Sequence, residues 1–480
     1  EESIGTAQKL KLVCVTGTGT NNLDKDYLAS RGIEWRNVAG YSTESVAQHT
    51  FALLFYLMEK LAFYDDYVKS ETYVNDTEFK HFSETFRLIC GKTWGIIGLG
   101  NQGTHYIAGL FNPGKIPNGV VTALCDNNPA KIEIMKTRTQ GQDIAYFDNY
   151  IDLLDSGLCD MVMVVVPHYF HPEMVIEALK RGIHVICDKP AGVYTKQVKE
   201  MNEVAKNSTA LFAMMFNQRT NCVYRKMREI VQAGGIGELQ RVTWIITDWY
   251  RTQQYYDSGS WRATWEGEGG GVLFNQCPHQ IDLVQWVVGE LPVQVNGFCQ
   301  YGKWHDIEVE DDVTAYFRYK NGATGMFITT TGEAPGTNRF EISGTKGKLL
   351  VENNKLYYWQ NEQDSQEWSK TATIGFIPPK CTMTEVETDG ENPQHMGIIN
   401  NFIAAIRGEE PLFVDGKEGI NGVELMNAME LSGWNNGEPI MLPVDEDRYL
   451  RELEQHVANS KKKICNDGAV ADTAGTFGSK

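Results

Sequence analysis

The stretch GIIGLGNQG, residues 95–103, constrains the fold of this chain more than any other. It has the spacing G-x-G-x-x-G and lies between an apolar, strand-like run and a helix-like run. In that context the first glycine permits a tight turn, the second lets the backbone approach a pyrophosphate, and the third lets helix and strand pack. Free N–H groups at the helix start bind the phosphates, so the stretch predicts a dinucleotide site. Its predicted cofactor residues are Gly98, Gly100, Asn101, Gln102 and Gly103.

Length and composition exclude several classes of protein. The 480 residues suffice for two or three domains at about 150 residues each. A net charge of −18 argues against nucleic acid or an anionic membrane as the main partner. No apolar run approaches the ~20 residues of a membrane span, and the N-terminus lacks the apolar core of a signal peptide. The ten cysteines show neither C-x-x-C nor metal-ligand spacing, so we expect a cytoplasmic protein with reduced thiols and no metal.

The pattern of elements changes near residue 220. From residue 93 strands alternate with helices, including apolar strands at 120–126 and 161–167, which predicts an α/β doubly wound parallel sheet. Long successive strands with Asn-Gly at a turn then predict an α+β domain with a large, mainly antiparallel sheet. The predicted domains are a front segment at 1–90, a Rossmann domain at 91–217, a substrate and oligomerisation domain at 218–457, and a disordered tail at 458–480.

An acidic residue, Asp126, ends the second of these strands, twenty-odd residues after the glycines. A carboxylate at that position accepts hydrogen bonds from the ribose 2′-hydroxyl and repels a 2′-phosphate, so NAD is favoured over NADP. The neighbouring Asn127 is assigned to the same cofactor site. The alternative is a plain glycine turn followed by a solvated aspartate.

Two further stretches carry polar groups suited to catalysis. Lys189 follows a parallel strand, at the carboxyl edge where ligands bind. A glycine run then precedes Asn275, His279 and Asp282, whose spacing of four and three predicts one helical face. The alternatives are a surface lysine, a satisfied structural histidine and a solvated helix carboxylate at Asp282.

Together these stretches resemble the glucose–fructose oxidoreductase, inositol dehydrogenase and rhizopine-catabolism (Gfo/Idh/MocA) family, over about residues 92–450. The resemblance rests on the glycine fingerprint, PHYFH at 167–171, ALKRGIHVICDKP at 178–190 and GGGVLFNQCPHQID at 269–282. It implies NAD as the cofactor, Lys189 at the nicotinamide and substrate, and His279 as proton acceptor. The other residues assigned to the cofactor are Pro167, His168, His171, Lys189 and Asn217.

Two positions depart from the family pattern. The usual E-K-P motif reads Asp188-Lys189-Pro190, and the aspartate often found four residues before the histidine is Asn275. An asparagine oxygen can orient an imidazole but cannot stabilise an imidazolium by charge. Asp282 is the candidate for that charge, if its side chain turns inward. His279 is then the expected base and Lys189 the group that holds the alkoxide oxygen.

The segment DWYRTQQYYDSGSWRATW, 248–265, combines aromatic rings with arginine and glutamine. Aromatic faces with such donors suit a polyhydroxylated ring, although core packing accounts for about half of these aromatics. The predicted substrate residues are Lys189, Arg219, Trp261, Arg262 and His279.

These inferences predict an NAD-dependent oxidoreductase acting on a secondary hydroxyl of a sugar, cyclitol or glycoside. Two alternatives stay open: a redox-neutral enzyme with retained NAD, glycosidase- or epimerase-like, and a non-catalytic NAD or sugar sensor. We expect a homo-oligomer, dimer or tetramer, formed through the C-terminal sheet, with neither nucleic acid nor membrane as partner.

The front of the chain resembles a different family, the D-2-hydroxyacid dehydrogenases, over about residues 10–98. The marker is RGIEWRNVAGYSTESVAQHT at 31–50, followed by an apolar helix expected at 45–60. That family needs an arginine, a glutamate and a histidine after its own fingerprint, and that portion is replaced here. We interpret residues 1–90 as a fused remnant, a partial flavodoxin-like segment without chemistry of its own.

Overall fold

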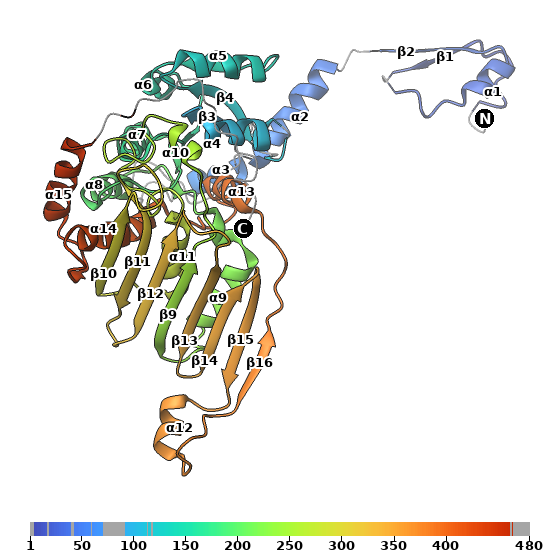
Figure 1. Cartoon of the computed structure of the whole chain (residues 1–480). Helices are drawn as coiled ribbons and strands as arrows, with labels where there is room; N and C mark the ends of the chain where they lie inside the picture. The colour runs from blue at the N-terminus through green and yellow to red at the C-terminus, as the bar shows by residue number, and fades with distance from the viewer. Residues whose placement is uncertain are drawn as a thin grey trace. The chain divides into compact units, whose positions relative to one another are not determined.

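The computed structural model describes residues 4–16, 19–39, 43–58, 60–70, 92–112, 114–116, 119–460 and 463. The chain forms two compact units, Glu1–Cys90 and Gly91–Lys480. Figure 1 labels their helices and strands. Among the described residues, no helix is both long and apolar enough to cross a bilayer.

The first unit is small and has little core. Strands β1 (Leu12–Val15) and β2 (Glu34–Asn37) pair in parallel, connected by α1 (Lys25–Ser30). Asp24 caps α1, its side chain accepting the N–H of Tyr27 at 2.9 Å. Two further helices follow, α2 (Thr43–Met58) and α3 (Leu61–Lys69), and α2 lies where the apolar helix is expected.

The second unit begins with a six-stranded, all-parallel sheet in the order β5-β4-β3-β6-β7-β8. The predicted doubly wound sheet is therefore confirmed. Its strands are β3 (Lys92–Ile97), β4 (Gly119–Cys125), β5 (Ala145–Phe147), β6 (Met161–Val164), β7 (His184–Cys187) and β8 (Phe212–Met214). Its helices are α4 (Asn101–His105), continued by a π-helix (Tyr106–Phe111), α5 (Pro129–Arg138), α6 (Tyr150–Asp155), α7 (His171–Lys180) and α8 (Thr195–Lys206).

A nine-stranded sheet follows, in the order β16-β15-β14-β13-β9-β12-β11-β10-β17. Every neighbouring pair is antiparallel except β12 with β9, so the predicted mainly antiparallel sheet is confirmed. Its strands are β9 (Leu239–Ile246), β10 (Gln294–Tyr301), β11 (Glu310–Arg318), β12 (Thr324–Thr330), β13 (Asn338–Gly344), β14 (Gly347–Glu352), β15 (Lys355–Asn361), β16 (Cys381–Glu385) and β17 (Ile440–Met441).

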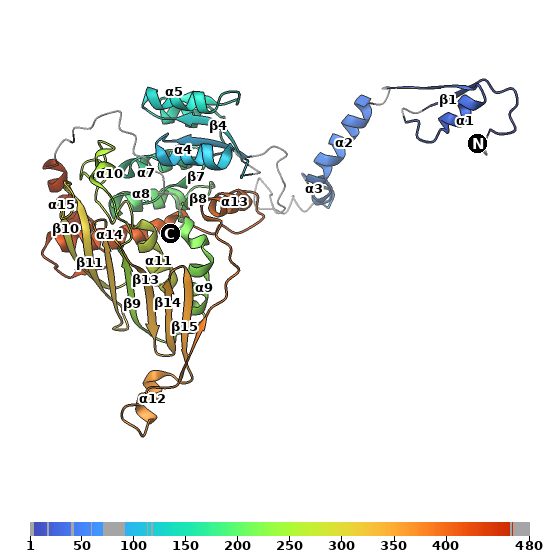
Figure 2. The same cartoon turned by 45° about the vertical axis from the view of Figure 1, so that its right-hand side comes forward.

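In Figures 1 and 2 the parallel sheet and its helices lie at the top of the second unit, and the long strands extend below it. One face of the large sheet packs on helices, with α14 (Gly419–Trp434) against β10. The remaining helices are α9 (Cys222–Gln232), α10 (Gln253–Asp257), α11 (Pro278–Val288), α12 (Ser365–Thr371), α13 (Gln394–Ile406) and α15 (Glu446–Ala458). Of the predicted tail at 458–480, only 458–460 and 463 are described; the rest lies outside the described residues.

Candidate functional site

The glycine turn between β3 and α4 has the geometry that a dinucleotide requires. Gly98 has φ +103°, and a Cβ there would lie 2.2 Å from the carbonyl oxygen of Val165. A Cβ on Gly103 would lie 1.9 Å from the carbonyl oxygen of Gly98, so both positions demand glycine. At Gly100, the N-cap of α4, a Cβ would meet nothing within 4 Å. That open space beside free helix N–H groups fits a pyrophosphate.

Asp126 lies buried at the carboxyl end of β4, next to this turn. Its Oδ2 accepts the backbone N–H of Leu99 at 2.8 Å and pairs with Lys131 Nζ at 3.1 Å. Its Oδ1 accepts the N–H of Asn128 at 2.9 Å. The carboxylate therefore fixes the glycine turn. Asn127 beside it is exposed.

Two histidines of the PHYFH stretch lie after β6 and Pro167. His171 is buried, with Nδ1 2.6 Å from the carbonyl oxygen of Pro190 and Nε2 2.7 Å from that of Val166. Nδ1 of buried His168 lies 3.1 Å from the carbonyl oxygen of Glu268. Burial lowers the pKa of both rings. His171 therefore positions the Lys189-Pro190 loop and has no ring nitrogen left for the predicted cofactor contact.

Lys189 follows β7 and turns toward the second half of the unit. Its Nζ donates to the carbonyl oxygen of Asn275 at 2.6 Å. Burial lowers the pKa of this amine, while the nearby carboxylates of Asp188 and Glu268 act in the opposite direction. A partly buried amine held by a single carbonyl has donors left for a ligand oxygen, which disfavours the surface-lysine alternative.

The structure corrects the predicted placement of Asn275. Helix α11 begins at Pro278, so Asn275 lies in the preceding turn and shares no helical face with His279. Its Oδ1 accepts from Tyr255 Oη at 2.9 Å and from Gln276, and its Nδ2 donates to the buried carboxylate of Glu268. The asparagine thus links Lys189 to a buried acid, and among the described residues it makes no hydrogen bond to the His279 imidazole that it was expected to orient.

His279 stands in the first turn of α11, beside Lys189. Its Nδ1 is buried and has no hydrogen-bond partner among the described residues. Burial lowers the pKa of His279 well below its ordinary value, and nearby Lys189 and His395 add to this effect. A neutral imidazole with one nitrogen shielded suits a proton acceptor.

The expectation that Asp282 supplies charge to His279 is wrong. Asp282 accepts two hydrogen bonds from Arg219, at 2.6 and 2.7 Å, and each side chain of the pair is 1% exposed. Arg219 also pairs with Glu418 at 2.7 Å. The same network corrects the predicted substrate role of Arg219, because its guanidinium pairs with the buried carboxylate of Asp282 and with the partly exposed one of Glu418.

A group that sequence reasoning missed comes from the start of α13. His395 lies 5.5 Å from the ring of Tyr106, and its Nε2 is 3.5 Å from Gln102 Nε2. Burial lowers the pKa of His395 to about 4. Asn217 donates to the neighbouring Gln394, which has a positive φ of 52°. The only signal in the sequence was Asn392-Pro393 before an apolar helix, which indicates a helix start but not a site.

The loop before the glycine run brings aromatic and cationic groups toward Asn275. Arg262 Nη1 donates to Tyr255 Oη at 2.6 Å, and its guanidinium lies 4.8 Å from the Trp261 ring centroid. The Trp261 ring meets that of His168 edge-on at 5.9 Å. Lys463 donates to the carbonyl oxygens of Tyr256 and Arg262. The predicted substrate residues Trp261 and Arg262 thus lie together near the glycine run.

Comparison with known proteins decides the family. Residues 92–216 match the oxidoreductase family with an NAD-binding Rossmann fold, and residues 224–350 match the GFO/IDH/MocA C-terminal domain. Together these matches cover just over half of the chain. The chain belongs to the GFO/IDH/MocA family. It is an oxidoreductase whose first matched domain binds NAD.

Curated relatives of this GFO/IDH/MocA protein include sugar and cyclitol dehydrogenases. It is 26% identical over 268 residues to the myo-inositol 2-dehydrogenase of Thermotoga maritima, covering 54% of this chain and 75% of that protein. It is 27% identical over 224 residues to the levoglucosan dehydrogenase of Pseudarthrobacter phenanthrenivorans, covering 41% and 56% respectively. The chain therefore spans three quarters of the first relative and just over half of the second.

Solved structures share the fold of the GFO/IDH/MocA protein. One is the WlbA dehydrogenase from Bordetella pertussis in complex with NADH and UDP-GlcNAcA, which has a TM-score of 0.61 at 25% sequence identity. The match covers 74% of this chain and 100% of the WlbA chain. A levoglucosan dehydrogenase in complex with NADH and L-sorbose has a TM-score of 0.61 at 20% identity, with the same coverage.

Proposed function

We propose that this oxidoreductase transfers a hydride between a secondary hydroxyl of a sugar, cyclitol or glycoside and NAD. The observation that carries the proposal is the meeting of Lys189, from the Rossmann half, with His279, from α11: the charge of Lys189 adds to burial in lowering the pKa of His279. The sugar and cyclitol dehydrogenases among the relatives support the substrate class.

When bound, the nicotinamide accepts or returns the hydride. The chain supplies the other groups: His279 is proposed to take the hydroxyl proton on Nε2, because Nδ1 is buried and has no hydrogen-bond partner among the described residues. This role requires the neutral ring to carry its hydrogen on Nδ1. Lys189 Nζ donates to the same substrate oxygen and stabilises the charge that develops on it. Trp261 and Arg262 are proposed to hold the substrate ring.

Glu268 takes the electrostatic place of the missing aspartate in this scheme. Its carboxylate is buried, accepts from Asn275 Nδ2 and from the backbone N–H of Ala263, and lies near Lys189. A buried negative charge behind the Lys189–Asn275 link favours the charged form of the amine. Glu268 is therefore proposed as a positioning residue for Lys189.

NAD is proposed to lie with its pyrophosphate at the turn of Gly98, Gly100 and Gly103, beside Asn101 and Gln102. Asp126 would bind the hydroxyl groups of the adenosine ribose, and Asn127 would lie beside that ribose. Pro167, His168 and Asn217 line the path toward Lys189 along the carboxyl edge of the parallel sheet, whose strands the structure places side by side.

A redox-neutral reaction with retained NAD is the second candidate. It is favoured by one relative, the 2,7-anhydro-N-acetylneuraminate hydratase of Escherichia coli, 28% identical over 202 residues that cover 42% of this chain and 51% of that protein. In such a reaction the hydride would return to the substrate, and no NADH would be released.

The test is a panel of cyclitols, sugars and glycosides incubated with NAD, read as NADH absorbance. We expect stoichiometric NADH with at least one polyol, and loss of that signal in His279→Ala. Product formation without NADH, detected by chromatography, would replace the dehydrogenase with the redox-neutral candidate. Neither NADH nor product with any compound would contradict both.

Three further proposals concern the whole chain. We propose that residues 1–90 are a D-2-hydroxyacid dehydrogenase-like remnant, with domain limits at 91–217 and 218–457.

We propose self-association through the large sheet, supported by the exposed side chains of Phe298, Tyr316 and Met326 on adjacent strands. Light scattering on the Tyr316→Asp variant tests this proposal. A cytoplasmic location is supported by eight free cysteines among the described residues.

A further inference from the structure

A hollow of about 280 Å³ lies in the second unit, lined by residues with no part in the chemistry proposed above. One wall is the stretch Tyr250–Gln253, which leads from β9 into the first residue of α10. The other wall is Trp304 and His305 between β10 and β11, and Gly332 follows β12. The hollow therefore lies between two loops that leave the same end of the large sheet.

Trp304 is 53% exposed, yet its orientation is set from several sides. Its Nε1 donates to Asp312 Oδ2 at 3.0 Å, and Lys303 Nζ lies 4.7 Å from its ring centroid. A Cβ on Gly332 would lie 2.3 Å from Trp304 Cγ, so the indole packs on bare backbone there. Trp304 lines the hollow and Lys303 does not, which leaves indole surface facing the hollow. An exposed aromatic ring already held in place loses little conformational entropy when a ligand stacks on it.

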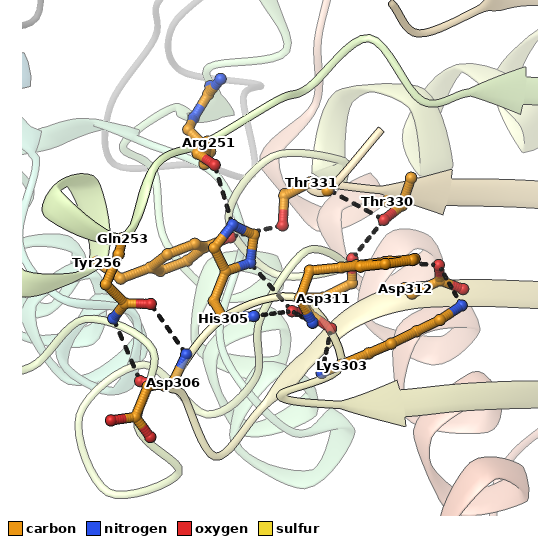
Figure 3. A network of polar contacts seen from close by, with 12 residues as sticks. Arg251, Gln253, Tyr256, Lys303, His305, Asp306, Asp311, Asp312, Thr330 and Thr331 are labelled. Carbon is orange, nitrogen blue, oxygen red and sulfur yellow. Dashed lines mark hydrogen bonds and ion pairs between the residues drawn. The ribbon is translucent and has the colours of Figure 1, made fainter. Parts of the chain in front are cut away.

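The two walls are bound to each other by the network in Figure 3. His305 bridges them, with Nδ1 3.0 Å from Asp311 Oδ2 and Nε2 2.9 Å from the carbonyl oxygen of Arg251. The buried Asp311 carboxylate also accepts the backbone N–H groups of residues 303, 304 and 305. Gln253 exchanges hydrogen bonds with the backbone of Asp306. The hollow is therefore pre-formed.

Arg251 contributes a cation with capacity to spare. Its Nη1 donates to the carbonyl oxygens of Tyr250 at 2.9 Å and of Trp249 at 3.4 Å, but its guanidinium pairs with no carboxylate among the described residues. Its guanidinium lies 5.2 Å from the ring centroid of Tyr255, whose hydroxyl bonds to Asn275, the residue that holds Lys189. One aromatic side chain thus separates the hollow from the reacting centre.

We infer that this hollow is a second sugar subsite, which binds the ring attached to the one that is oxidised. Trp304 and the half-exposed Tyr250 contact the apolar face of that ring, and Arg251 donates to its hydroxyl or carboxylate oxygens. The inference rests on the proposed function and narrows it: the substrate is a glycoside or disaccharide, not a free monosaccharide or cyclitol.

The test uses the full chain with NADH present and measures binding of cellobiose, maltose, lactose and their component monosaccharides by calorimetry. At least one disaccharide should bind about tenfold more tightly than its monosaccharides, and Trp304→Ala should remove that advantage. Trp304→Phe should retain most of it, because a ring remains. Phe376→Ala removes another exposed ring far outside the hollow and should leave both affinities unchanged.

Three results would overturn the inference. One is that no disaccharide binds more tightly than its monosaccharides; another is that Trp304→Ala weakens both equally. The third is loss of self-association in Trp304→Ala with disaccharide affinity retained, which would assign this face to a second copy of the chain. NADH release is measured separately, so that the two proposals can fail independently. If NADH is released but no disaccharide binds more tightly than its monosaccharides, only the subsite is contradicted. If a disaccharide binds more tightly but is not turned over, only the proposed function is contradicted.

Discussion

The two units differ in how far they bury their apolar and charged side chains. In the first, Leu28 and Ile33 are the buried apolar residues among those described, and Phe51 of α2 is 54% exposed. In the second, a continuous core runs through both sheets and includes fully buried Trp94 and Trp244. A two-stranded sheet and separate helices have little to hold a catalytic geometry, whereas the second unit buries the supports of Lys189 and His279. Local propensity is enough for the elements of the first unit; a site needs the packing of the second.

The strongest test of that contrast is the removal of the two proposed catalytic groups. Lys189→Ala and His279→Ala should each lower kcat/KM by about 10²- to 10⁴-fold while NAD binding stays intact, whereas Lys25→Ala in the first unit should change neither. The measurements are steady-state kinetics and NAD titration. A loss below tenfold in His279→Ala would exclude it as the base.

The same histidine predicts a pH dependence. A base must be neutral to act, and burial holds the pKa of His279 well below the ordinary 6.5. The kcat/KM profile should therefore stay flat as pH falls through 6.5 and decline only at lower pH. An acidic limb centred at or above 6.5 would contradict this environment.

The next largest effect is expected on stability, when a buried ion pair of the second unit and an exposed ion pair of the first are each broken. Arg219→Ala leaves Asp282 buried without its partner and should lower the free energy of unfolding by about 3–5 kcal/mol. Arg36→Ala breaks the pair with Glu34, in which both side chains are 69% exposed, and should leave unfolding unchanged. Urea titration followed by fluorescence measures both; equal effects would mean that the first unit is as cooperative as the second.

A smaller effect is expected at the cofactor. Asp126→Ala removes the proposed ribose acceptor and an anchor of the glycine turn, so NAD binding should weaken by about 1–3 kcal/mol and NADP should be better tolerated. Asp26→Ala, on the surface of α1, serves as the control. If the unaltered chain already binds NADP more tightly than NAD, the role given to Asp126 is wrong.

The fold followed from the sequence where periodicity and glycine geometry govern it. The G-x-G-x-x-G turn, the parallel strands and the change to antiparallel pairing all reflect local patterns, and they are confirmed. The helix near His279 was placed one turn too early, because the expected shared face ignored Pro278, which begins the helix at its own position. Local spacing also predicted His279 as the partner of Asp282, whereas the structure pairs Asp282 with Arg219.

Long-range partners were beyond sequence reasoning. Arg219 and Asp282 are 63 residues apart, and Glu418 lies further still, so nothing local indicates their pairing. His395 reaches Gln102 of the glycine turn only because α13 returns to the parallel sheet, where Phe402 packs on Trp94. Glu268 lies within a glycine run that drew attention to flexibility instead of charge. Tertiary packing brings such groups together, and their positions in the sequence do not indicate it.

The smallest effect is expected from the largest change, removal of the whole first unit. The central claim is that cofactor, chemistry and stability reside in residues 91–480, so deletion of residues 1–88 is its most direct test; the cut spares Thr93, whose strand builds the sheet. NAD affinity and turnover of the shortened chain should equal those of the full chain, and solubility should improve because the exposed apolar surface of α2 is gone. A shortened chain that fails to fold or to bind NAD, beside a full chain that is soluble and active, would contradict the account.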